Sequence, residues 1–360
     1  MNKHVKRVII ILGSVVGVLG AMVLGLFLNG TDFQKYSDNE IDKKDWMSSL
    51  KDETLINGII MPGSHDSGTN TMSWLGQTQT YSVKEQLQIG VRYFDLRVNK
   101  KGEDDLIIYH DIIDGSDFEP IISDISKFLS DNQSETVLLD FQHFKNESQN
   151  DVKGLIDEYL TKDGLVIKNE TSDSDLKFVS ELTLGQCRGK CLIFFGDYSL
   201  DSNYDYGNNI FSRNNDECSF ENMSLDSCYL SSYHKGNSQD FIDEALPEYF
   251  KRIKEKKERD GDKGIFVLQC QLTDGKLIFG PYSREKSHDS NISEYIASLK
   301  DNADFSLVNV VLRDFFTGEK SAQIISLNNY KDNLKETLRD NTKNLIFLEN
   351  QYGKMHNREN

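Results

Sequence analysis

Short apolar runs that alternate with amphipathic stretches constrain the fold of this chain more than any other feature. From Leu55 onward most of these runs are continuously apolar and contain β-branched residues, which is typical of strands covered on both faces. The stretches between them repeat apolar residues with helical spacing. The alternation therefore predicts an α/β protein whose parallel strands and helices close into an irregular TIM (β/α)8-type barrel.

The bounds of the predicted elements follow from the ends of these runs. The predicted strands are Ile56–Met61, Val91–Val98, Leu106–Tyr109, Thr136–Phe141, Cys191–Phe195, Asn209–Phe211, Ile265–Cys270 and Val308–Leu312. The predicted helices are Ser82–Ile89, Ile121–Leu129, Val152–Leu160, Phe241–Lys257, Ile292–Leu299 and Ser321–Asn341.

Polar residues that can take part in catalysis or ligand binding follow several of the predicted strands. In a barrel of this type the carboxyl ends of the strands carry the functional residues, because the βα loops emerge there. The residues in such places are His65 and Asp66 after the first strand, Asp95 and Arg97 in the second, His110 after the third, Gln142 and His143 after the fourth, and Asp314 after the eighth. We therefore expect these side chains to gather at one mouth.

The two histidines His65 and His110 are the strongest candidates for catalysis. A single histidine at a strand end is more often a structural hydrogen-bonding residue. Two at equivalent strand ends supply groups that titrate near neutrality, as a general base and a general acid working together require. Arg97 lies between them in the sequence and can clamp a phosphate bidentately, while an ion pair with Asp66 or Asp95 would hold it in place.

The N-terminus predicts a membrane anchor. Positive residues precede an uninterrupted apolar run from Val8 to Leu28, which is long enough to cross a hydrocarbon core of about 30 Å. We expect cytoplasmic residues 1–7, an uncleaved signal anchor at 8–28, a linker at 29–46, a catalytic barrel at 47–345 outside the cytoplasm and a tail at 346–360. A cleaved signal peptide and a secreted protein are the alternative.

Charge and cysteine content exclude several other classes of protein. The formal net charge of −17 argues against nucleic-acid binding, which needs a basic face, and against spontaneous adsorption to an anionic membrane. The five cysteines show no zinc-binding spacing, so no structural metal is assigned. Cys218 and Cys228 flank a polar loop, and a disulfide or two unpaired thiols are both open.

Three segments of the chain resemble a known family. Met61–Thr69 (MPGSHDSGT), Gln86–Arg97 (QLQIGVRYFDLR) and Tyr109-His110 resemble the X domain of phosphatidylinositol-specific phospholipase C. Glu135–Phe144 and Val311–Phe316 resemble the branch of X-domain-containing proteins. The resemblance extends from residue 46 to residue 330 and is strongest in the first hundred residues of that span.

This resemblance implies an irregular TIM barrel and an intramolecular phosphoryl transfer. His65 would take the proton of the inositol 2-hydroxyl as this oxygen attacks phosphorus. His110 would protonate the departing diacylglycerol oxygen, so that inositol 1,2-cyclic phosphate is formed. Asp314 would hold the tautomer of His65, and Asp66 would orient Arg97 or support the acid.

The resemblance also implies the ligands of the site. Arg188, Asp95 and Gln142 would contact the substrate. No cofactor and no metal are expected, because Arg97 places a fixed positive charge where calcium-dependent members hold their cation. The expected partners are an inositol phospholipid at a membrane surface and glycosyl-phosphatidylinositol anchors, and the chain is expected to be a monomer.

Two other functions are compatible with a barrel of this kind. A metal-dependent glycerophosphodiester phosphodiesterase also has a histidine pair at its mouth, but it needs carboxylates around a divalent metal. A non-catalytic lipid- or glycan-binding barrel would bind its ligand without turnover. Only the intramolecular route forms a cyclic phosphate, so the reaction product separates the three.

Overall fold

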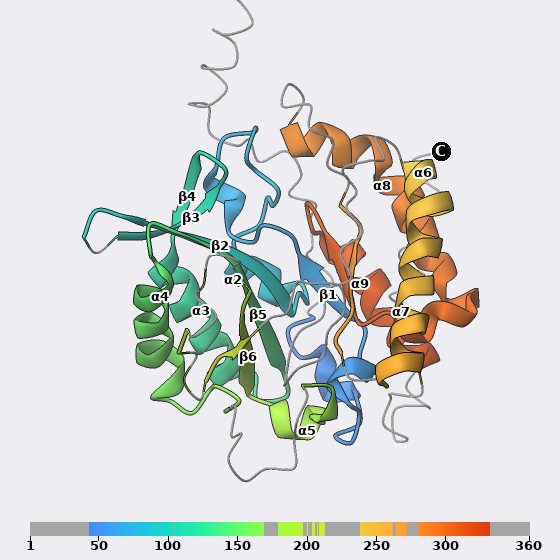
Figure 1. The fold of residues 1–360 in the computed structure, drawn as a ribbon, viewed down its shortest axis with the longest axis horizontal. Helices are drawn as coiled ribbons and strands as arrows, with labels where there is room; N and C mark the ends of the chain where they lie inside the picture. The colour runs from blue at the N-terminus through green and yellow to red at the C-terminus, as the bar shows by residue number, and fades with distance from the viewer. Residues whose placement is uncertain are drawn as a thin grey trace, which may run out of the picture.

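A curled parallel sheet forms the centre of the computed structural model, which describes residues 43–103, 105–168, 179–196, 200, 204–205, 207, 209–212, 238–261, 264–271 and 280–331 (Figure 1). The strands run in the order β7-β6-β5-β2-β1-β9-β8. They are β1 (Met61–Ser64), β2 (Tyr93–Lys101), β5 (Thr136–Lys145), β6 (Lys190–Phe195), β7 (Phe211–Ser212), β8 (Val267–Gln269) and β9 (Val310–Arg313). This arrangement confirms the α/β barrel-like class.

The closure of the predicted barrel is not observed in the described part of the chain. There β7 and β8 are the two edges of the sheet, and no described pairing joins them. The molecule is thus a curled sheet of half-barrel form in these ranges. The sixth predicted strand corresponds to β7, of which the described residues are Phe211 and Ser212.

The predicted strand Leu106–Tyr109 does not belong to the barrel, and that prediction was wrong. These residues lie in β3 (Asp105–His110), which pairs antiparallel with β2 and with β4 (Ile113–Asp117). A parallel crossover needs a dozen or more residues, and only a short turn separates β2 from β3. β3 and β4 are labelled at the left of Figure 1, and His110 is the last residue of β3, next to the turn into β4.

Helices cover the outer face of the curled sheet, with α3 and α4 at the left and α7, α8 and α9 at the right of Figure 1. They are α2 (Val83–Gln88), α3 (Phe118–Asp131), α4 (Gln149–Ile156), α5 (Leu184–Cys187), α6 (Ser238–Asp240), α7 (Leu246–Asp260), α8 (Gly280–Ser298) and α9 (Gly318–Ser326). Each predicted helix has a counterpart, with shifted ends. The helix predicted from Ser321 begins earlier, because Thr317 caps it by accepting from the N–H of Lys320.

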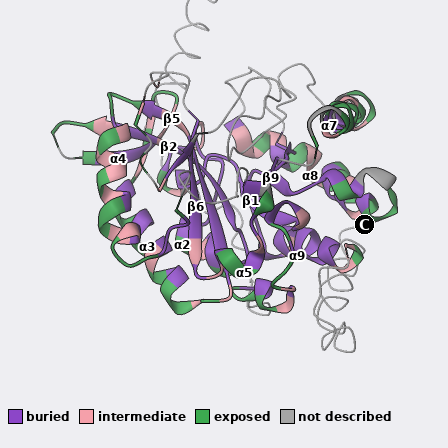
Figure 2. Cartoon of the chain, turned by 60° about the horizontal axis from the view of Figure 1, so that its bottom comes forward, coloured by how far each residue is buried: buried purple, intermediate pink, exposed green. Residues whose placement is uncertain are grey.

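Two apolar clusters divide the buried residues of the strands, which are coloured purple in Figure 2. Residues such as Phe94 and Phe141 pack outward against the helices. Tyr93, Leu138 and Leu312 fill the interior of the curled sheet. Side chains alternate between the two faces along each strand. This alternation also determines which face the polar side chains at the carboxyl ends point to.

β1 lies between β2 and β9 in the sheet and sets the position of the residues that follow it. Its Gly63 pairs with Tyr93 on one side and with Leu312 on the other. A Cβ at Gly63 would lie 2.7 Å from Cγ1 of Val310 and 3.0 Å from Cδ1 of Tyr93. Glycine is therefore required for the neighbouring side chains to pack this closely inside the curled sheet.

Several predictions fall outside the described residues. These are the N-terminal segments up to residue 42, residues 332–345 with the end of the last predicted helix, the tail from residue 346, and the pair Cys218 and Cys228. No helix within the described ranges has the length and apolar character needed to cross a membrane. Cys187, Cys191 and Cys270 are buried free thiols.

Candidate active site

The carboxyl ends of four neighbouring strands bring most of the predicted site residues together. Asp314 follows β9, His65 follows β1, Arg97 lies in β2, and Gln142 lies in β5, and these strands are adjacent in the order β9-β1-β2-β5. The β3–β4 hairpin returns His110 to the same place from the side of β2. The predicted gathering at one mouth is therefore observed for these residues.

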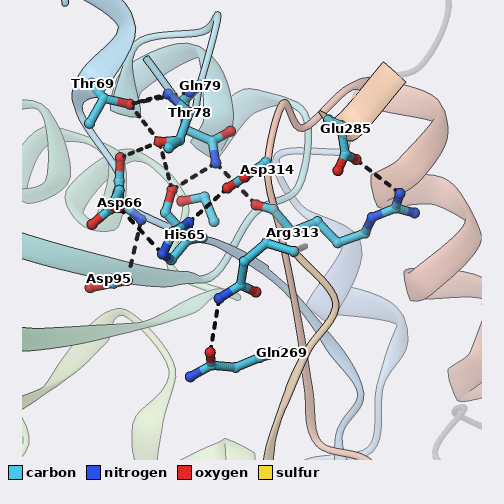
Figure 3. Close-up of polar contacts among 12 residues, drawn as sticks. His65, Asp66, Thr69, Thr78, Gln79, Asp95, Gln269, Glu285, Arg313 and Asp314 are labelled. Atoms are coloured by element: carbon cyan, nitrogen blue, oxygen red, sulfur yellow. Dashed lines mark hydrogen bonds and ion pairs between the residues drawn. The ribbon is translucent and has the colours of Figure 1, made fainter. Parts of the chain in front are cut away.

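His65 is buried at the end of β1 and held at both its backbone and its ring. Its backbone N–H donates to the carbonyl of Arg313, at 3.1 Å. Its Nδ1 lies 2.8 Å from Oδ1 of Asp314 (Figure 3). Because a carboxylate only accepts, Nδ1 carries the hydrogen, and Nε2 is then the basic nitrogen of the neutral ring.

His110 is held in the same way by a different acceptor. Its Nδ1 lies 2.9 Å from the carbonyl oxygen of Gly76, which can only accept a hydrogen bond. The other nitrogen of this ring, Nε2, faces the mouth, and it carries a hydrogen when the ring is charged. The two histidines thus each have Nδ1 engaged and Nε2 available.

Asp66 lies between the two histidines and Arg97. Its Oδ2 is 3.3 Å from Nε2 of His65 and 3.5 Å from Nε2 of His110, while Nε of Arg97 lies 2.6 Å from its Oδ1. Asp66 adopts a left-handed backbone, with φ of 44°, which costs a non-glycine residue roughly 1 kcal/mol. Its N–H donates to Oδ2 of Asp95, at 3.2 Å, and this contact helps to hold the strained turn.

The charges of this group shift its pKa values in opposite directions. Burial lowers the pKa of His65, but the carboxylates of Asp66 and Asp314 outweigh it and raise the pKa to about 9. Burial raises the pKa of Asp66, but the cations around it, Arg97 first, hold that pKa well below its usual range. Burial raises the pKa of Asp95 to about 6, against the effect of Arg97.

The buried loop between the 3-10 turn at Thr69–Thr71 and α2 supports the backbone of the site, and this role was not predicted. Nε2 of Gln79 donates to the carbonyls of His65, at 2.9 Å, and Arg313, at 3.0 Å, and so links the ends of β1 and β9 (Figure 3). The Thr78 hydroxyl lies 3.1 Å from the carbonyl of Asp66. Thr69 accepts from the backbone N–H groups of both Thr78 and Gln79.

A second unpredicted feature is a buried charge network behind Asp314. Arg313 points away from the interior, and its Nη2 lies 3.0 Å from Glu285 and 2.6 Å from Asp289, both in α8. Nζ of Lys320 contacts the same two carboxylates at 2.5 and 2.8 Å, and it donates to the Asp314 carbonyl at 3.1 Å. The network fixes the strand end from which Asp314 reaches His65.

Arg188 is the predicted substrate-contacting residue that the structure does not bring to the mouth. It precedes β6 and therefore lies at the amino end of the sheet. Its guanidinium pairs with Asp52 at 2.8 Å and donates to the carbonyls of Met47, at 3.1 Å, and Leu50, at 2.8 Å. These contacts attach the segment before β1 to the sheet, so the role of Arg188 in this structure is structural.

Asp95 and Gln142 lie beneath the mouth, on neighbouring strands. Asp95 pairs in register with Asp140, which accepts a short hydrogen bond from the Tyr93 hydroxyl. Nε2 of Gln142 lies 3.3 Å from Oδ2 of Asp140. These groups form a polar floor between β2 and β5, with donors and acceptors already arranged.

The described residues include one group with the composition of a metal site. Ligand atoms of His65, Asp66 and Asp95 lie within 4.8 Å of one another. Arg97 already places its positive charge 2.6 Å from Asp66, and a divalent cation there would be repelled by the guanidinium. The donor set therefore fits a metal poorly while Arg97 is in place, and metal independence stays a prediction.

The chain matches the family model for the X domain of phosphatidylinositol-specific phospholipase C over residues 59–195. It is 31% identical over 173 residues to the 1-phosphatidylinositol phosphodiesterase of Listeria monocytogenes, covering 45% of this chain and 51% of that protein. It is 32% identical over 142 residues to the mouse PI-PLC X domain-containing protein 3, covering 29% and 44%. The matches thus span about half the length of these curated relatives, or less.

Solved structures show a similar fold at lower identity. A phosphatidylinositol-specific phospholipase C from Listeria monocytogenes aligns with a TM-score of 0.59 and 22% identity, over 80% of this chain and 99% of that one. A variant of the Staphylococcus aureus enzyme aligns with a TM-score of 0.56 and 19% identity, over 82% and 98%. At such identities the likeness concerns the fold alone.

Proposed function

Because residues 59–195 belong to the phosphatidylinositol-specific phospholipase C X-domain family, we propose that this chain cleaves the phosphodiester of an inositol phospholipid. One observation carries the proposal. Two histidines with engaged Nδ1 atoms present Nε2 to one oxygen of Asp66, while Arg97 contacts the other oxygen. A base, an acid and a fixed cation therefore converge on one point, as a phosphoryl transfer with two proton movements requires.

His65 is the base of the proposed reaction. The inositol 2-hydroxyl oxygen attacks phosphorus, and its proton passes to Nε2 of His65. Asp314 keeps the other nitrogen protonated and stabilises the imidazolium that forms. Attack by a hydroxyl of the same molecule needs no activated water, and it removes much of the entropic barrier.

His110 is the acid. As the bond from phosphorus to the diacylglycerol oxygen breaks, this oxygen takes the proton from Nε2 of His110. The products are diacylglycerol and inositol 1,2-cyclic phosphate. Exchange of one proton with solvent at each ring restores the starting protonation states, so the reaction balances without a cofactor.

Arg97 and Asp66 have complementary parts in this scheme. The guanidinium offers planar donors that match the phosphoryl oxygens and stabilise the charge that develops on them. Asp66 holds Arg97 through the 2.6 Å contact and keeps the two imidazoles oriented before substrate arrives. A metal-dependent diesterase is less consistent with this arrangement, because Arg97 takes the place of the cation.

The raised pKa of His65 has a kinetic consequence. With a pKa of about 9, His65 is protonated in most ligand-free molecules at neutral pH, and only the neutral minority can act as base. One bend of the profile of kcat/KM against pH should therefore lie near pH 9.

A product assay with matched variants tests the function. The full chain in mixed micelles would be given phosphatidylinositol, its phosphorylated forms or a glycosyl-phosphatidylinositol-anchored protein, with chelator present, and the released phosphate identified by ³¹P NMR. Phosphatidylinositol should give the cyclic phosphate, and His65→Ala or His110→Ala should lower the rate by about 10² to 10⁴. His288→Ala in α8 is the matched control. An acyclic product alone, or full activity in His65→Ala, would contradict the proposal.

We also propose that residues 8–28 anchor the chain as a single membrane-spanning helix, with the barrel outside the cytoplasm. The uninterrupted apolar run and the positive residues before it support this topology. Alkaline carbonate should leave the full chain in the membrane pellet, and protease added outside intact cells should digest the barrel. Release of the chain into the medium would support the secreted alternative.

A further inference from the structure

A β-bulge in β5 changes which residue of this strand faces the mouth. Before the bulge, Leu138 and Asp140 face the interior, whereas Val137, Leu139 and Phe141 pack outward. Unbroken alternation would turn Gln142 inward and His143 outward, toward the helices. The register instead steps from Leu96↔Phe141 to Arg97↔His143, so Gln142 is the extra residue.

The residue after the bulge confirms the change of face. Phe144 pairs with Val98, belongs to the outward cluster and stacks on Phe141 with ring centroids 5.9 Å apart. Since Phe144 points outward, His143 must point to the opposite face, which it shares with Arg97. Bulges of this kind re-aim a side chain near functional sites at the expense of one ladder position.

His143 then extends the row of functional residues that lies along the carboxyl ends of adjacent strands. Asp314, His65, Arg97 and His143 come from β9, β1, β2 and β5, which are consecutive neighbours in the sheet. Neighbouring strands lie about 4.8 Å apart, so His143 is one strand spacing from Arg97. It is half-exposed, so a ligand at the mouth can reach it. Its charge also contributes to the lowered pKa of Asp66.

We propose that His143 is a substrate-binding residue of this site, which the bulge at Gln142 turns toward Arg97 so that its imidazole contacts the headgroup. The inference rests on the proposed phosphodiester cleavage and adds a residue to it. The headgroup, rather than the diacylglycerol, belongs on this side because the floor between β2 and β5 is polar. Gln142, which is half-exposed above the buried Asp140, can exchange hydrogen bonds with ring hydroxyls, whereas acyl chains offer it no partner.

Kinetics of His143 variants in the full chain test this contact. His143→Ala should raise KM for phosphatidylinositol and the inhibition constant of myo-inositol together, each about tenfold, as the loss of one hydrogen bond predicts. The value of kcat should stay within about threefold, because His143 moves no proton in the reaction. His143→Gln retains a donor and should recover part of the loss. His288→Ala is the control, since the pKa of His288 responds to burial and Arg284 rather than to the site.

An NMR titration of the wild-type chain provides a second readout that does not depend on how a variant folds. With ¹⁵N-labelled histidines, myo-inositol should shift the ring signals of His143, and inorganic phosphate should chiefly shift those of His65 and His110. A folded His143→Ala protein with unchanged KM and inhibition constant, or His143 signals that ignore saturating myo-inositol, would overturn the inference. A wild-type chain that binds myo-inositol through His143 but forms no cyclic phosphate would instead refute the proposed reaction.

Discussion

Nδ1 of His65 lies 2.8 Å from Oδ1 of Asp314, although 249 positions separate the two residues in the sequence. The pairing of β1 with β9 creates this contact, because it aligns Ser64 with Arg313 and so places the next residues side by side. The carboxylate fixes the ring tautomer and also raises the pKa of the imidazole. The orientation of the His65 ring therefore depends on this contact, whereas its pKa depends on Asp66 and on Asp314 together.

Asp314→Asn should separate these two effects. The amide can present its NH₂ group to the ring and favour the wrong tautomer, so kcat should fall by about 10⁴-fold. With one carboxylate removed, the pKa of His65 should also decrease, and the bend in the profile of kcat/KM against pH should move to lower pH. Steady-state kinetics between pH 5 and pH 10 measure both, with the exposed Asp301→Asn as control. A lower rate with an unmoved bend would show that Asp314 orients the ring without setting its pKa.

The pH dependence of stability provides a test without substrate. The folded-state pKa of His65 is about 9, above the ordinary histidine value of 6.5, so protonation stabilises the folded chain. This contribution is fully present below pH 6.5 and is lost as pH rises through 9, with a magnitude of about 3 kcal/mol. Chemical denaturation of the wild type and of His65→Gln at several pH values should show a slope that only the wild type has. Parallel curves would contradict the raised pKa.

Arg97→Lys should not preserve activity. Nε of Arg97 lies 2.6 Å from Asp66 and Nη2 lies 3.9 Å from Asp95, and in the proposed reaction the same planar fork also meets phosphoryl oxygens. An ammonium at this position can make either contact but not both in the same planar geometry, so kcat should fall by roughly 10²-fold. Arg252→Lys, on the exposed face of α7, is the matched control. Near-normal kcat in Arg97→Lys would show that charge alone suffices.

The sequence predicted the residues at the mouth because they follow apolar strands, and the carboxyl-end rule of parallel sheets applies to them directly. His65, Arg97 and Asp314 were located in this way. The same rule should have excluded Arg188, which precedes its strand and lies at the opposite end of the sheet. The short turn between β2 and β3 was a signal of a hairpin, because it cannot hold a parallel crossover.

Other features of the site left no signal in a single sequence. The bulge that turns His143 depends on the register between β2 and β5, which no periodicity reveals. Gln79 lies in an irregular loop, and its two contacts, to His65 and Arg313, exist only once β1 and β9 are paired. The partners of Arg313 come from α8, whose position against β9 is a property of tertiary packing.

Arg188→Ala should affect stability and leave catalysis intact. The side chain is mostly buried and holds the carbonyls of Met47 and Leu50 together with Asp52, far from the mouth. Its removal leaves buried carbonyls without donors, which should lower the free energy of unfolding by about 1–3 kcal/mol. At temperatures below the lowered midpoint of unfolding, kcat and KM should equal those of the wild type. A raised KM in a folded variant would restore the substrate contact that the sequence suggested.

Arg313→Met should be strongly destabilising, and more so at high pH. The guanidinium is completely buried, and its loss leaves Lys320 alone to balance Glu285 and Asp289. Removing one partner of a buried charge group typically costs about 3–5 kcal/mol. Burial raises the pKa of Glu285 to about 7, against the effects of Lys320 and Arg313. Without Arg313 this pKa rises further, so the carboxyl can become neutral more readily and the cost should shrink as pH falls from 8 to 5.

Denaturant unfolding at pH 5 and pH 8 measures the effect of the uncompensated Glu285 carboxylate. It compares Arg313→Met with the double variant Arg313→Met/Glu285→Gln. The double variant should recover much of the stability at pH 8, because the uncompensated carboxylate is gone, and should show little difference between the two pH values. Lys127→Met is the control, since the ion pair of Lys127 with Asp131 is exposed to solvent and should contribute nothing measurable. A loss of equal size at pH 5 and pH 8, without recovery in the double variant, would identify packing rather than charge as the role of Arg313. Recovery would establish that α8 supports the strand end beneath Asp314 by electrostatic contacts.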